Sequence, residues 1–272
     1  MLLTSPVWAQ EPGEVTDEDV HPLLVNGFSM DIGVFFPRRT LDLRVNRANP
    51  ALPGENTLID LDQEFGLRNG DETTAVEMAW RYGQRWSFLG QYFKSTYGVT
   101  KTLDEDISWD DIVFNAGSSA TVAGGFQLTR FFFGRELDTS PKHNFGIGGG
   151  IHWMDIGTAI EGTVIVNDEP FSERRSARIE GPLPNIGVWY KYSITPRWAF
   201  RSRLDFFSAS IDRYDGYMIN GGLGLNFRAW EHIGFGLSYN YFELDVDVAE
   251  TNWHGDIETI YSGAYVSVTA FF

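Results

Sequence analysis

The sequence contains no cysteine, and its 21 Lys and Arg residues are outnumbered by 37 Asp and Glu residues, giving a formal net charge of −16. A chain without cysteine can form no disulfide framework and offers no thiol nucleophile. The shortage of basic residues argues against nucleic acid as a partner, because binding to phosphate requires a basic surface. The acidic excess is typical of solvated loops and of a soluble folding intermediate.

Long apolar runs are missing as well. No stretch of about 18 consecutive apolar residues follows the N-terminus, so the sequence predicts no transmembrane helix. The 29 glycines and the 15% of aromatic residues suit a sheet protein with many tight turns better than a helical bundle. A β-barrel can cross a membrane with such a composition, because its lipid-facing residues alternate with residues that face the lumen.

Alternation of apolar and polar residues with a period of two recurs along the chain. Met30, Ile32 and Val34, for example, share one face of a predicted strand, and Asp31 and Gly33 share the other. Segments of this kind cover residues 28–36, 76–82, 86–100, 120–129, 145–153, 185–192, 198–211, 219–227, 233–239 and 261–272. They predict about ten strands. Two short alternating segments, 40–45 and 57–62, either extend the first hairpin or add two crossings, which would give twelve strands.

The links between these segments alternate in length. Short links at 83–85, 193–197 and 228–232 alternate with long polar links at 102–115, 158–181 and 245–256, except that the short link at 212–216 falls on the side of the long ones. Aromatic residues, among them Trp80, Trp86 and Trp198, gather at the strand ends beside the short links. Short turns on one side, long loops on the other and a ring of aromatic residues are features of membrane barrels. The predicted fold is therefore all-β, a membrane-spanning antiparallel up-and-down β-barrel.

The N-terminal residues differ in character from the rest. Val7 and Ala9 match the small-residue pattern before a signal-peptidase site, so residues 1–9 are predicted to be a signal-peptide remnant. Residues 10–24 begin as an acidic, aperiodic stretch, which predicts a flexible periplasmic lead-in. The transmembrane barrel is expected to occupy residues 25–272.

The C-terminal residues carry a resemblance to a known family. Tyr261 and Gly263, followed by Val266 and Val268 at alternate positions, lead to the terminal Phe272. This arrangement resembles the C-terminal aromatic signature of Gram-negative outer-membrane β-barrel proteins, and the segment 59–67 resembles a stretch near the start of uncharacterised members. The resemblance implies a bacterial outer-membrane location and contact with outer-membrane lipid and lipopolysaccharide. It also implies that the barrel-assembly machinery recognises the C-terminal signal during insertion.

The alternation directs a set of charged and polar side chains to the lumen. Charges there must pair or meet water, because an unpaired charge in a dry interior is very costly. These side chains predict either a ladder of ion pairs that fills a small barrel or a polar channel for a small solute. The predicted lumen-lining residues are Asp31, Glu77, Arg81, Lys191, Arg201, Arg203, Asp205, Asn226 and Arg228.

No pattern in the sequence predicts a catalytic, metal or cofactor site. His152 with Asp155, and His254 with Asp256, could each pair a base with a carboxylate as a hydrolase does, but neither forms a specific motif. The acidic residues in 104–111 lack the spacing of a calcium-binding loop. The preferred hypothesis is a structural or narrow-pore barrel for small solutes. The alternative is a binding protein that uses its extracellular loops, and a barrel enzyme is least favoured, so the sequence predicts a protein that is not an enzyme.

Overall fold

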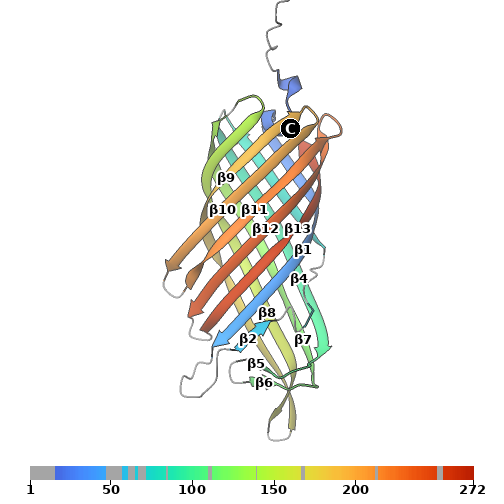
Figure 1. Ribbon diagram of the computed structural model, residues 1–272, viewed down its shortest axis with the longest axis vertical. Coiled ribbons are helices and arrows are strands. Elements are labelled where there is room, and N and C mark those ends of the chain that lie inside the picture. Colours follow the sequence, from blue (N-terminus) through green and yellow to red (C-terminus); the bar gives the residue numbers. More distant parts are fainter. Residues whose placement is uncertain are drawn as a thin grey trace, which may run out of the picture.

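The computed structural model describes residues 16–46, 57–60, 65–66, 72–83, 85–109, 112–138, 140–166, 169–211, 214–249 and 254–272. Within these ranges no helix has the length and apolar character needed to cross a membrane. Ten strands form an antiparallel barrel in which each strand pairs with its neighbour in the chain (Figure 1). They are β1 (Phe28–Asn46), β3 (Thr73–Tyr82), β4 (Trp86–Thr102), β7 (Ser119–Asp138), β8 (His143–Val166), β9 (Glu169–Thr195), β10 (Trp198–Ile211), β11 (Tyr214–Arg228), β12 (Ile233–Ala249) and β13 (His254–Phe271).

The first and last strands close the barrel. β1 pairs with β13 along its whole length, from Ser29 opposite Phe271 to Asn46 opposite His254. The predicted all-β up-and-down barrel is therefore confirmed, with ten strands rather than twelve. Of the two short segments left open by the sequence, 40–45 continues β1, and the short strand β2 (Thr57–Asp60) pairs with the end of β1.

The last strand, β13, has one buried and one exposed face. Tyr265, Ser267 and Thr269 point into the barrel and are buried, whereas Val266 and Val268 point outward and are half exposed. A one-residue change of register would reverse every face of the strand. The sequence pattern near the C-terminus therefore set both the register and the inside of the barrel.

The long strands change polarity part-way along their length. On β8 the outward residues Ile147, Ile151 and Trp153 are exposed and apolar, whereas Asp155 and Glu161, farther along the same face, are polar. The inward face changes in the opposite sense, from polar to apolar. The barrel therefore carries an apolar belt around the half that holds the chain termini, and its other half has an apolar interior and a polar exterior.

This inversion determines which face of the segment 120–129 lies inside the barrel. Val122, Phe126 and Leu128 have the alternation expected of a lipid-facing stripe, but they are fully buried inside the outer half of the barrel. The long link expected at 158–181 is a β-hairpin formed by the ends of β8 and β9. Both differences arise because the strands continue well beyond the apolar belt.

The two ends of the barrel are covered differently. At the end that holds the termini, the one-turn helix α1 (Pro22–Val25) follows the 3-10 turn η1 (Asp17–Asp19). Val20, Leu23 and Leu24 are buried against Ala199 and Phe271. The expected flexible lead-in over residues 10–24 is therefore packed against the barrel at its C-terminal part, because these apolar side chains find a buried surface there. The signal remnant expected at 1–9 lies outside the described residues.

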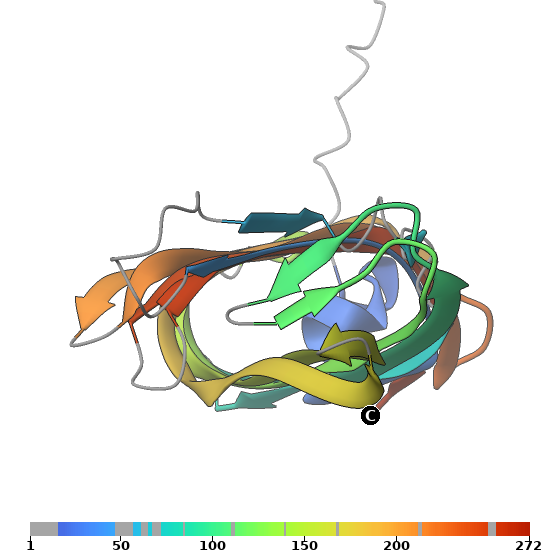
Figure 2. The same ribbon diagram turned by 90° about the horizontal axis from the view of Figure 1, so that it is seen from below.

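The outer end is crossed by a second hairpin. Strands β5 (Ile107–Trp109) and β6 (Ile112–Phe114) pair with each other alone and lie across the mouth of the barrel (Figure 2). Ile107, Trp109 and Phe114 are buried in the core that fills the outer half. The hairpin therefore extends that core and covers it from outside.

Candidate functional site

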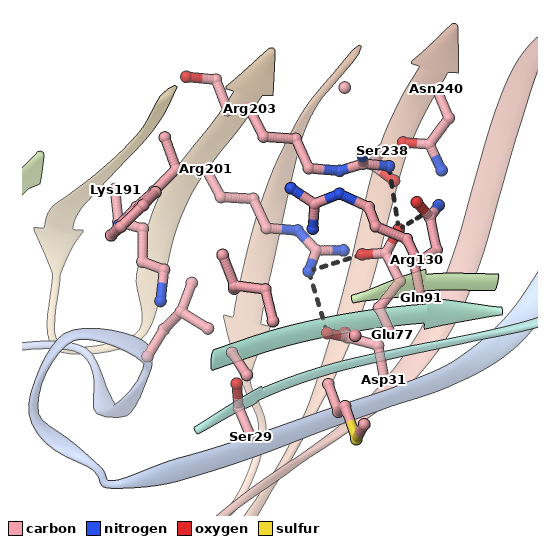
Figure 3. A pocket seen from close by; sticks show the side chains of 18 of the residues that line it. Ser29, Asp31, Glu77, Gln91, Arg130, Lys191, Arg201, Arg203, Ser238 and Asn240 are labelled. Atoms are coloured by element: carbon pink, nitrogen blue, oxygen red, sulfur yellow. Dashed lines mark hydrogen bonds and ion pairs between the residues drawn. The ribbon is translucent and has the colours of Figure 1, made fainter. Parts of the chain in front are cut away.

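The lumen on the side of the termini contains a network of charged side chains from opposite walls (Figure 3). Arg201 on β10 donates to Asp31 on β1 at 2.9 Å and lies 3.4 Å from Glu77 on β3. Arg203, two residues farther along β10, lies 3.6 Å from the same glutamate. Both arginines of β10 therefore reach carboxylates on the opposite wall of the barrel, Asp31 on β1 and Glu77 on β3.

The most deeply buried ion pair joins Arg130 on β7 to Asp205 on β10. The guanidinium donates two hydrogen bonds to the carboxylate, from Nε at 2.6 Å and from Nη2 at 2.8 Å. Arg203 lies 3.7 Å from the same carboxylate. A bidentate pair of this kind fixes both side chains in one geometry.

His152 completes this cluster. Its imidazole lies 3.7 Å from Asp205 and is fully buried. Nε2 hydrogen-bonds Asn220 at 2.8 Å, and Nδ1 hydrogen-bonds Asn185. Both ring nitrogens are therefore occupied by amides, and burial closes the ring to a substrate.

The histidine pairs weighed from the sequence do not form in the described structure. Asp155 points outward from the barrel and receives two hydrogen bonds from Arg178, at 2.7 and 2.8 Å. It therefore lies on the opposite face of β8 from His152. The side chain of His254 lies outside the described residues, so its pairing with Asp256 stays a prediction.

The remaining predicted lumen residues lie nearer the terminal end. Arg81 donates to Glu136 at 3.0 Å, and Asn226 donates to Thr269 at 3.0 Å. Lys191 lines the chamber next to α1, and Arg228 is half-buried. The structure brings Asp31, Glu77, Arg201, Arg203 and Asp205 into one network, while Arg81, Lys191, Asn226 and Arg228 surround its terminal side.

Sequence reasoning missed three buried lumen residues that take part in these contacts: Arg130, Glu136 and His152. Arg130 and Glu136 lie just beyond the predicted segment 120–129, and their inward direction follows only once Phe126 and Leu128 are known to face inward. The alternation places His152 on the polar face of its strand, but the nearby Asp155 suggests a different partner. An odd-even count carried on from Leu128 would have found both charged residues.

The chamber enclosed by this network is small. Its cavity volume is about 80 Å³, and its lining includes Asp31, Glu77, Arg130 and Leu23 of α1. Among the residues that the structure describes, no group of His, Asp or Glu side chains has the arrangement of a metal site.

The outer half of the lumen is filled by apolar side chains. The ring of Phe126 lies 5.0 Å from that of Phe93 and 4.8 Å from those of Phe242 and Tyr261. A cavity of about 280 Å³ borders this core, with Met154, Leu183, Phe207 and Leu244 in its lining. The lumen therefore consists of a polar, ion-paired half and an apolar half with free volume at its side.

No family model matches the chain, and no curated protein does. Solved structures do match. The outer membrane protease OmpT from Escherichia coli is 10% identical, with a TM-score of 0.61 over 90% of this chain and 96% of that chain. The Pseudomonas putida toluene transporter TodX (8% identity, TM-score 0.37, 90% of each chain) and Ail, the attachment invasion locus protein of Yersinia pestis (9%, 0.30, 89% of this chain and 99% of that one), are also similar. The chain has the fold of a bacterial outer-membrane β-barrel.

An outer-membrane location agrees with this fold and with the apolar belt. The expectation that the protein is not an enzyme needs correction. OmpT is a protease, and its barrel is similar to this one over nearly the whole of both chains. The absence of a catalytic motif in the sequence therefore does not decide against catalysis.

Proposed function

We propose that this protein is a non-conducting outer-membrane barrel that binds an apolar ligand in the outer half of its lumen. The observation that carries the proposal is the change of the lumen from paired charges to apolar side chains at the outer rim of the belt. The apolar half of the lumen lies at the end of the barrel away from the chain termini. This position suits an apolar ligand that approaches from the outer side of the membrane.

The polar half supports a sealed barrel rather than a narrow pore. Asp31 and Asp205 are each paired with an arginine at less than 3 Å, and the chamber between the pairs holds only about 80 Å³. Leu23 and Leu24 of α1 close the same half from the terminal side. Of the two lumen hypotheses, the ladder of ion pairs is therefore favoured over the polar channel.

Planar-bilayer recording tests the sealed lumen. We expect no current steps from the wild-type barrel, and current steps from a variant that carries Leu23→Ser, Arg201→Ser and Arg203→Ser. Steady current through the wild-type protein would reject the sealed barrel.

Native mass spectrometry tests the ligand. The barrel, released from detergent after incubation with a saturated fatty acid, should carry one added molecule. Gly181→Phe, which fills the cavity beside the outer core, should lose that molecule and keep its heat-modifiable migration on gels. A wild-type barrel that binds no fatty acid would reject the apolar ligand.

Catalysis at the outer end is a second candidate function, favoured by the likeness to OmpT. On the outer surface of β11 and β12, the partly buried Glu243 accepts hydrogen bonds from Tyr217 and Tyr241 at 2.5 Å each. Incubation with a mixed peptide library would support this candidate if cleavage occurs and Glu243→Gln abolishes it. If the peptides stay intact, peptide cleavage at this cluster is rejected.

A further inference from the structure

The pairing between β9 and β10 ends early. The last paired residues are Ile186 and Phe206, although β9 stays paired with β8 as far as Glu169 and β10 with β11 as far as Ile211. In Figure 1 the orange end of β10, at the lower left, leans away from the hairpin of β8 and β9, which reaches the bottom of the view. We call this unpaired stretch, residues 181–185 of β9 and 207–211 of β10, the seam.

Two prolines lie on the side of β9 that faces the seam. The N–H of Ser193 donates to the carbonyl of Lys142, on the β8 side, at 2.9 Å. Backbone groups of alternate residues point to the same neighbouring strand, and the register between β8 and β9 is unbroken. The N–H positions of Pro182 and Pro184 therefore face β10, where proline has no hydrogen to donate.

These prolines weaken closure of the seam. A continued register would place Pro184 opposite Ser208 and Pro182 opposite Ser210. Each of these pairs would lack one of its two backbone hydrogen bonds, because the proline donor is missing. The missing donors therefore favour an open seam.

The cavity of about 280 Å³ passes through the wall at the seam. Its lining includes inward residues such as Leu183 and Phe207, and also the outward-facing Pro182 and Pro184. A Cβ built at Gly181, another lining residue, would meet no atom within 4 Å. The cavity therefore joins the apolar interior of the barrel to its outer surface.

The position of the seam relative to the apolar belt indicates which molecules can reach it. Pro184 lies opposite Ile151 and Pro182 opposite Trp153, both exposed apolar residues at the rim of the belt. Farther out on the same face of β8 comes the polar Asp155. At this rim, water and lipid headgroups can satisfy the open backbone groups, which hydrocarbon could not do.

We propose that the seam admits one acyl chain of an outer-leaflet lipid into the apolar outer half of the lumen. The proposal rests on the proposed function and names its ligand and its route. The chain would lie against Leu183, Phe207 and Leu244, while its headgroup stays at the polar mouth beside Glu180 and Asp215, which belong to the same cavity lining. Ile179, Leu183 and Phe207 are the partly buried side chains that the core leaves open at this point.

A reversible disulfide tests the route, and the absence of native cysteine keeps the test clean. The variant Pro184→Cys/Ser208→Cys joins the two strands across the seam after oxidation. The matched control, Ile186→Cys/Phe206→Cys, joins the strands two residues earlier, at their last paired position. Both variants are folded in reduced form, reconstituted in liposomes that contain a phospholipid with a diazirine in its acyl chain, and then oxidised and irradiated.

Peptide mapping of the labelled residues gives the readout. We expect label on the inward residues Leu244 and Phe207 of the reduced protein and of the oxidised control. Oxidation of the seam variant should reduce this label at least about tenfold, and reduction of the disulfide should restore it. Label on Leu237, which faces lipid in the belt, should not change and serves as the internal standard.

Label confined to belt residues in every sample would overturn the proposal, and so would inward label that survives closure of the seam. Gly181→Phe supplies a second variant that needs no disulfide, and it should also lose the inward label. Fatty-acid binding that persists after closure of the seam would reject the route and leave the proposed function standing. A wild-type barrel that binds no fatty acid would reject the proposed function, the binding of an apolar ligand.

Discussion

The buried pair Arg130–Asp205 allows the energetics of the lumen to be measured against a control of matched geometry. Arg178 and Asp155 on the outer surface form a second bidentate pair, at 2.7 and 2.8 Å, against 2.6 and 2.8 Å in the lumen. The two pairs differ in burial: the side chains of the outer pair are 61% and 29% exposed, and those of the lumen pair 3% and 1%.

We expect Asp205→Asn to lower the free energy of unfolding by about 3–5 kcal/mol, because Arg130 is left as an uncompensated buried charge. Asp155→Asn removes the same interaction from Arg178 in solvent and should cost at most about 1 kcal/mol. The difference of at least about 2 kcal/mol corresponds to a change of roughly 30-fold in the ratio of folded to unfolded protein.

Urea unfolding in lipid vesicles, followed by the heat-modifiable migration of the closed barrel on gels, measures both variants. The double variant Arg130→Met/Asp205→Leu should recover much of the lost stability, because it removes both charges together. Equal losses for Asp205→Asn and Asp155→Asn would refute the reasoning, since burial would then contribute nothing to the cost.

Three further predictions concern α1, the last strand and the terminal chamber. Burial, with a smaller contribution from nearby Arg228, lowers the pKa of His21 to about 4. Docking of the segment that contains α1 therefore favours the neutral ring of His21. This preference stabilises the docked segment by up to about 3 kcal/mol above the ordinary pKa of 6.5, and the stabilisation is lost as pH falls from 6.5 toward 4. Proteolytic cleavage in the segment that follows residue 16 should increase over that pH range in the wild-type protein and stay constant in His21→Gln. Val268 points outward and is 51% exposed, so Val268→Arg should cost roughly 2–4 kcal/mol near the midplane of the bilayer. Ser267 is 3% exposed and donates a hydrogen bond to Asp31, so Ser267→Arg should block folding altogether. Insertion of the two variants into vesicles compares these effects. Gly146→Ala should destabilise the barrel by about 1–3 kcal/mol, because its Cβ would clash with the Trp189 ring, and Trp189→Leu should restore part of that loss in urea unfolding.

The belt could be predicted from the sequence because periodicity and phase agree there. Ile32 and Val268 alternate with Asp31 and Ser267, and hydrocarbon outside with polar groups inside leaves only one orientation. Beyond the belt the same period continues, but water lies outside and the core inside. Alternation alone does not say which face of a strand is inward. It therefore predicts a strand around Phe126, but it does not predict which of the two faces lies inside the barrel.

The sequence does contain a signal for the inversion. When the apolar face changes sides without a bulge, an outward apolar residue is followed or preceded directly by an inward one. Phe36 and Phe35, Tyr92 and Phe93, and Trp153 and Met154 are such neighbours, with the first of each pair exposed and the second buried. Phe206 with Phe207 and Tyr241 with Phe242 repeat the signal on β10 and β12. Adjacent apolar residues at one level of successive strands therefore locate the rim from the sequence alone.

The lumen charges were predicted as a set, but their partners were not. Inward direction follows from alternation, so Asp31, Glu77 and Arg201 could be assigned to the lumen from their own strands. Which of them meet depends on the diameter and shear of the closed barrel, because the partners lie on strands far apart in the sequence. Arg130 was missed for a further reason, since the apolar alternation of its strand suggests the opposite phase.

The rim is the level at which an apolar molecule can cross the wall at the lowest cost. On the side of the rim that holds the termini, hydrocarbon lies outside the wall and the ion pairs of Asp31 and Asp205 lie inside, so an acyl chain that entered there would separate buried charges. On the other side of the rim, the apolar core lies inside and water lies outside, so an acyl chain would have to leave the bilayer to reach the wall. At Phe206 and Phe207 apolar surfaces lie on both sides of the same strand, and the pairing of β9 with β10 ends there, so the wall is open at this point. A barrel that inverts its polarity therefore has one level suited to lateral entry, and the prolines of β9 weaken the wall at that level.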